Sequence, residues 1–112
     1  MSDPGLSHVR ELLVRLRSTL DDHGDGYGSG AVTRVLAGST DDLRAFLTSN
    51  ELWGGAGSIA DQAGITGGPT DGRRAIEAAL VNLGEVQITL GLLNERTKTW
   101  VEAFKHWQRD GL

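Results

Sequence analysis

The fold of this chain is decided by residues 71–109, DGRRAIEAALVNLGEVQITLGLLNERTKTWVEAFKHWQR. A heptad frame started at Ile76 gives two columns of side chains, and nine of the ten members are apolar or aromatic. The columns are Ile76, Leu83, Leu90, Thr97 and Phe104, and Ala79, Val86, Leu93, Trp100 and Trp107. No proline interrupts the run. The spacing predicts one long helix, or two helices end to end, with a single buried seam.

Two glycines within this stretch modify the prediction. Gly84 and Gly91 each cost about 1 kcal/mol inside a helix relative to alanine. They are seven residues apart and share one helix face, which indicates close approach by another backbone or a kink near Gly91. We expect a bend or break near residues 91–95. It would leave helices of about 20 and 15 residues, both ordinary lengths, the second starting at Asn94 or Thr97.

The first residues predict an amphipathic helix over 4–22. Ser2 or Asp3 can cap it, and Pro4 fits the first helical turn, where its missing N–H costs nothing. Leucine and valine then recur at three- and four-residue spacing: Leu6, Val9, Leu12, Leu13, Leu16 and Leu20. This face predicts packing against the C-terminal stretch, antiparallel or crossed.

Glycine shapes the expectation for the middle of the chain. Most of the 16 glycines fall in residues 24–30, 54–57 and 64–72, which are therefore expected to form turns or loops. Residues 23–30 carry four glycines and are expected to form a flexible loop rather than a helix. A calcium loop starting at Asp21 fails, because Val32 stands where the bidentate glutamate should be.

Short helical segments are expected between these loops. Residues 31–36 suit one or two helical turns. A second helix should begin at residues 39–42, where a hydroxyl cap precedes two carboxylates. A third should begin at Ile59, because Ser58 and Asp61 have capping-box spacing. Together these segments predict one all-α domain over residues 1–112: a small helical bundle with a long C-terminal helix or helix pair and a Gly-rich loop.

Composition narrows the classes of function. The chain has no cysteine, which removes disulfides, zinc–thiolate sites and a thiol nucleophile. Its net charge of −4, with scattered basic residues, disfavours nucleic-acid binding. The sequence given contains no signal peptide and no membrane-spanning run, so we expect a cytoplasmic protein that does not bind a membrane. We also expect it to bind no metal and no cofactor.

Residues 53–61 are the candidate functional stretch. Its candidate ligand- or partner-binding residues are Trp53, Gly54, Gly55, Gly57, Ser58 and Asp61. Backbone N–H groups at a glycine turn leading into a helix can bind an anion. The stretch is neither a P-loop nor a Gly-x-Gly-x-x-Gly fingerprint. The alternatives are that Trp53 anchors the loop in the core, or that the stretch is a surface for a protein partner.

The same nine residues carry a resemblance. The pattern aromatic-Gly-Gly-x-Gly-Ser-apolar-x-Asp, from Trp53 to Asp61, resembles a motif of small, uncharacterised bacterial proteins. Some of those proteins occur in settings that suggest immunity or anti-phage roles. The group has no established activity, so the resemblance implies no catalytic residue. It implies that the stretch does more than form a turn.

The remaining patterns point to binding rather than catalysis. Ser58 does not sit in a Gly-x-Ser-x-Gly elbow, which disfavours a hydrolase. Trp100, Phe104 and Trp107 form an aromatic stripe that is either core or an interface for a second copy or a partner. We therefore expect a non-enzymatic protein that binds another protein, in an immunity, antitoxin-like or adaptor role, and forms a homodimer. The alternative is a small-molecule or anion-binding domain, conceivably an enzyme, that uses Trp53–Asp61.

Overall fold

The computed structural model describes residues 4–24, 26–54, 58–60 and 70–109. The regular elements in these ranges are helices: α1 (Pro4–Asp22), α2 (Gly26–Ala37), α3 (Thr40–Leu47), α4 (Asn50–Trp53), α6 (Thr70–Leu90) and α7 (Thr97–Arg109). The fold is an all-α helical bundle, which confirms the class predicted from the sequence.

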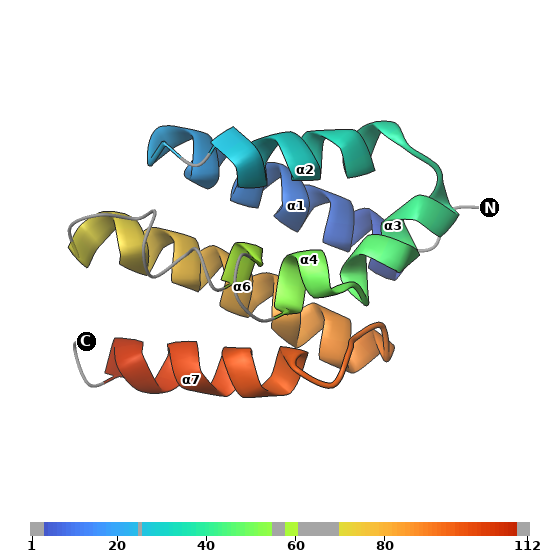
Figure 1. Ribbon diagram of the computed structural model, residues 1–112. Helices are drawn as coiled ribbons and strands as arrows, with labels where there is room; N and C mark the ends of the chain where they lie inside the picture. Colours follow the sequence, from blue (N-terminus) through green and yellow to red (C-terminus); the bar gives the residue numbers. More distant parts are fainter. Residues whose placement is uncertain (1–3, 25, 55–57, 61–69, 110–112) are drawn as a thin grey trace.

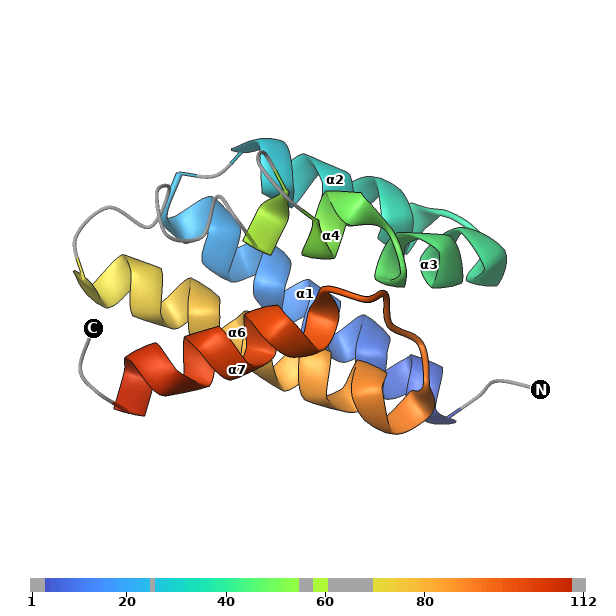
Figure 2. The same cartoon turned by 60° about the horizontal axis from the view of Figure 1, so that its bottom comes forward.

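The four longest helices lie side by side in the order α2, α1, α6, α7. Helix α1 packs against both α2 and α6, and α6 packs against α7. Figure 1 shows that α1 runs antiparallel to α2 and to α6, and that α7 runs back along α6. The short helices α3 and α4 follow α2 along one face of this layer (Figure 2). The molecule measures 42 × 25 × 23 Å.

Helix α1 confirms the amphipathic helix predicted over residues 4–22. Its bounds are Pro4–Asp22. Each apolar residue of the predicted stripe is buried, with at most 6% of its surface exposed: Leu6, Val9, Leu12, Leu13, Leu16 and Leu20. The three- and four-residue spacing places these side chains on one face, and burying that face holds the helix on its neighbours.

The predicted break in the C-terminal stretch is also confirmed. Helix α6 ends at Leu90, and Gly91 has a φ of +75°, a left-handed conformation that favours glycine at a helix C-terminus. Helix α7 begins at Thr97, one of the two predicted starts. Because the chain turns here, α7 folds back on α6 and no straight helix overhangs the bundle (Figure 1).

The heptad columns are buried unevenly. Ile76 and Leu83 are fully buried, Ala79 and Val86 are only partly buried, and Leu90 is 37% exposed. A straight α-helix drifts by about 20° per heptad against a strict seven-residue repeat, so residues two heptads apart no longer face the same way. The prediction of a single buried seam is therefore wrong for the end of α6. This drift leaves apolar side chains at the edge of the core.

The loop expected over residues 23–30 is a second correction. Helix α2 begins at Gly26 and includes three of the four glycines. Gly28 and Ser29 are buried within it, and α2 packs along α1. Helix propensity is a weak preference that tertiary packing overrides, because burial of an apolar face contributes more than the glycines cost.

Helix α3 forms where the sequence predicts it. Ser39 is its N-cap: the Ser39 hydroxyl accepts a hydrogen bond from the Asp42 backbone N–H at 3.1 Å, and the Asp42 carboxylate accepts one from the Ser39 N–H at 3.0 Å. This reciprocal pair is a capping box. Further along, Ile59 and Ala60 are helical and buried, as predicted, whereas Asp61 lies outside the described residues.

Candidate functional site

Trp53, the first candidate residue, lies at the end of α4 and is fully buried. Its indole Nε1–H donates a hydrogen bond to the Gln87 side-chain oxygen at 2.8 Å. Gln87 comes from the last turn of α6 and is itself fully buried. The tryptophan is therefore an anchor in the core, with the polar end of its ring satisfied by a side chain 34 positions away.

Gln87 connects three parts of the chain. Its amide nitrogen donates to the carbonyl oxygens of Leu47 and Leu92, both at 2.8 Å. Leu47 ends α3, and Leu92 lies just after the glycine that ends α6. Each polar group of this buried amide has a partner, as a buried amide requires. Gln87 thus ties the ends of α3, α4 and α6 together.

Asn94 extends this buried network to α7. Its side-chain nitrogen donates to the carbonyl oxygens of Ser49 at 3.0 Å and Trp53 at 3.1 Å. Its side-chain oxygen accepts from the backbone N–H of Thr97 at 3.1 Å, at the first residue of α7. Thr97 is fully buried, and its hydroxyl accepts from the Asn94 N–H at 3.1 Å. The one polar member of the heptad columns is therefore part of a helix cap.

Gly54 sits where three elements meet. Its carbonyl oxygen accepts a hydrogen bond from the Trp100 indole at 3.0 Å. A Cβ added at Gly54 would lie 2.1 Å from the Asn50 carbonyl oxygen, so no side chain fits here. The glycine is explained by close packing against the backbone of α4, which is a structural role.

Gly84 also has a packing role. A Cβ at this position would lie 2.4 Å from Cγ2 of Val101 and 3.2 Å from Cζ2 of Trp53. Glycine therefore lets α7 and the Trp53 ring approach the surface of α6. Of the two explanations predicted for the glycine pair, a helix end applies to Gly91, whereas the close approach at Gly84 is made by side chains and not by another backbone.

The other residues of the candidate stretch divide in two. Ser58 is buried, and its hydroxyl donates to the Gly54 carbonyl oxygen at 3.2 Å. Gly55, Gly57 and Asp61 lie outside the described residues. The described part of the stretch directs its polar groups toward the rest of the chain. Ligand or partner binding by Trp53–Asp61 stays a prediction.

The aromatic stripe of α7 faces the bundle over its described part. Phe104 is 1% exposed, and its ring centroid lies 5.4 Å from that of Trp100. Trp100 is half-buried and packs against the core. The side chain of Trp107 lies outside the description. These contacts give Phe104 and most of Trp100 a role in the core, which leaves little of either for an interface.

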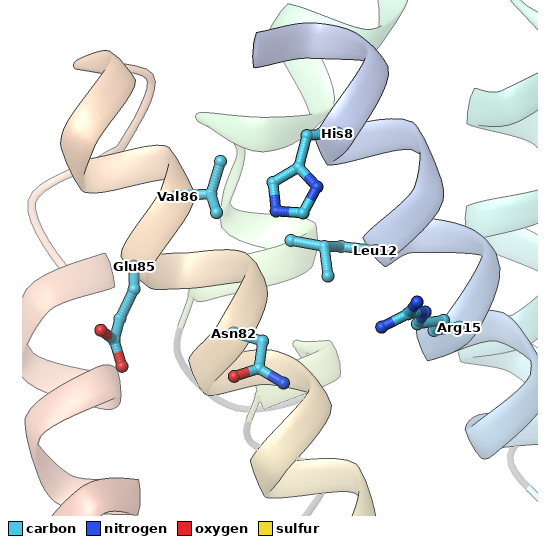
Figure 3. A pocket seen from close by; sticks show the side chains of 6 residues that line it. All are labelled: His8, Leu12, Arg15, Asn82, Glu85 and Val86. Atoms are coloured by element: carbon cyan, nitrogen blue, oxygen red, sulfur yellow. The ribbon is translucent and has the colours of Figure 1, made fainter. Parts of the chain in front are cut away.

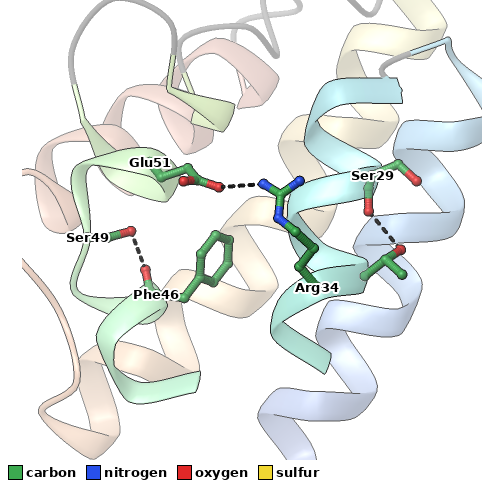
Figure 4. A network of polar contacts seen from close by, with 6 residues as sticks. Ser29, Arg34, Phe46, Ser49 and Glu51 are labelled. Atoms are coloured by element: carbon green, nitrogen blue, oxygen red, sulfur yellow. Dashed lines mark hydrogen bonds and ion pairs between the residues drawn. The ribbon is translucent and has the colours of Figure 1, made fainter. Parts of the chain in front are cut away.

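A surface ion pair joins α2 to the short helix α4. Arg34 of α2 lies 3.7 Å from the Glu51 carboxylate of α4, as Figure 4 shows. Both side chains are well exposed, so the pair contributes less than about 1 kcal/mol. Beneath it, the Ser49 hydroxyl donates to the Phe46 carbonyl oxygen at 2.7 Å. The contacts here suit a structural role.

The structure also reveals a groove that the sequence reasoning missed. It runs between α1 and α6, has a volume of about 370 Å³, and is lined by His8, Leu12, Arg15, Asn82, Glu85 and Val86. Figure 3 shows His8 opposite Val86, and Arg15 toward the end where Asn82 lies. Leu12 and Val86 form an apolar floor, and the polar and charged residues are exposed.

A signal for this groove is present in the sequence. Positions at the edge of α6 follow a helical spacing of four, three, four and four residues: Ala75, Ala79, Asn82, Val86 and Leu90. Such a stripe lies on one side of a helix. Three of its members, Ala79, Val86 and Leu90, also belong to the heptad columns, and this overlap concealed a second face.

Other classes of site find no support in the part of the chain that is described. Within it, no three His, Asp or Glu side chains gather closely enough to hold a metal ion. None of the described helices combines the length and apolar character needed to cross a membrane. Searches against models of protein families, curated proteins and solved structures returned no significant match.

Proposed function

We propose that this chain is a non-enzymatic bacterial protein of the cytoplasm that acts by binding another protein. The observation that carries the proposal is the α1–α6 groove. Its floor is apolar, and the side chains of Arg15, Asn82 and Glu85 around it make no hydrogen bond or ion pair with described residues. An apolar strip bordered by unpaired polar groups is typical of a surface that receives a partner helix.

The shape of the groove favours a protein over a small ligand. Sites for small molecules bury most of the ligand surface within a concave pocket. Here the groove lies between two exposed helix edges, and four of its six lining residues are exposed. The net charge of −4 and the lack of cysteine support a cytoplasmic protein that does not bind nucleic acid. An immunity, antitoxin-like or adaptor role is supported by the resemblance of residues 53–61.

Site-specific photo-crosslinking tests this proposal. A photoreactive amino acid at Asn82, which is exposed at the groove, should yield one predominant protein adduct in the cells that encode the chain. The matched control carries the same probe at Thr33, which is exposed on α2. Mass spectrometry of the purified adducts identifies the partner. A probe at Asn82 that yields no adduct, or the same weak background as Thr33, would overturn the proposal.

A further inference from the structure

We draw no further inference here: the strongest candidate, the groove between α1 and α6 with the exposed edge of α6 that continues to Leu90, belongs to the site already described, and nothing in the structure shows what covers it.

Discussion

At the scale of single residues, three polar side chains, of which Gln87 and Thr97 are buried and Asn94 is partly buried, decide how the short helices attach to the long ones. Gln87 holds the Trp53 indole, Asn94 holds the Trp53 carbonyl oxygen, and Thr97 completes the cap of α7. A buried polar group without a partner costs about 1–3 kcal/mol, so these groups favour one arrangement of the helices over others. The network explains why an amide and a hydroxyl occupy core positions.

Trp53 should contribute to stability more than any exposed aromatic residue. Trp53→Ala should lower the free energy of unfolding by about 3–5 kcal/mol, because it empties a fully buried position. Trp53→Phe keeps most of the apolar volume but leaves the Gln87 oxygen without its donor, and should cost about 1–3 kcal/mol. Urea unfolding followed by far-UV circular dichroism measures both changes.

Tyr27→Ala is the matched control for this prediction. Tyr27 is 62% exposed, so removal of its ring should change the unfolding free energy by less than about 0.5 kcal/mol. If Trp53→Ala instead kept the wild-type stability, the core role of Trp53 would be contradicted. The ligand-binding alternative for residues 53–61 would then gain support.

At the scale of the elements, glycine has opposite effects in two helices. In α2, Gly30 has no heavy atom within 4 Å of where a Cβ would lie, so it only weakens the helix. In α6, Gly84 is the contact point for Val101 and the Trp53 ring. Glycine thus only lowers the stability of one helix, whereas in the other it allows a close helix–helix approach.

Alanine at these two positions should change stability in opposite directions. Gly30→Ala should stabilise the fold by about 0.5–1 kcal/mol, because helix propensity improves and nothing clashes. Gly84→Ala should destabilise it by about 1–3 kcal/mol, because overpacking outweighs the gain in propensity. Thermal unfolding of each variant and of the wild-type chain, at the same pH and protein concentration, measures both changes in stability.

Val101→Ala tests the cause assigned to Gly84. Val101 provides the nearest atom to the added Cβ, at 2.4 Å. In the Gly84→Ala background, Val101→Ala should therefore cost less than it does in the wild-type chain, a coupling seen only between residues in contact. Additive effects of the two substitutions would contradict the close-approach explanation.

At the scale of the whole molecule, the described residues leave a groove between two of the four long helices. Helix α2 covers one flank of α1, and α7 covers one flank of α6. The groove lies between the remaining edges of α1 and α6.

Features that depend on neighbouring residues can be predicted from the sequence. The stripe of α1 fixed its bounds and its buried face, Ser39 and Asp42 fixed the start of α3, and Gly91 fixed the break before α7. Helical periodicity, helix capping and a glycine with positive φ each involve residues that are close together in the sequence. A short stretch of sequence is therefore enough to predict them.

Features that depend on distant partners follow from how the helices pack. Gly28 is helical and buried in α2, which packs along α1. Trp53 is an anchor because its indole binds Gln87, 34 positions away, and Leu90 is exposed because the face of α6 rotates out of the core. Each outcome depends on which surfaces meet, and a pattern along one segment carries no information about the surface opposite it. The groove also depends on packing: the sequence contains the stripe on α6, but the opposite wall comes from α1, the first of the described helices.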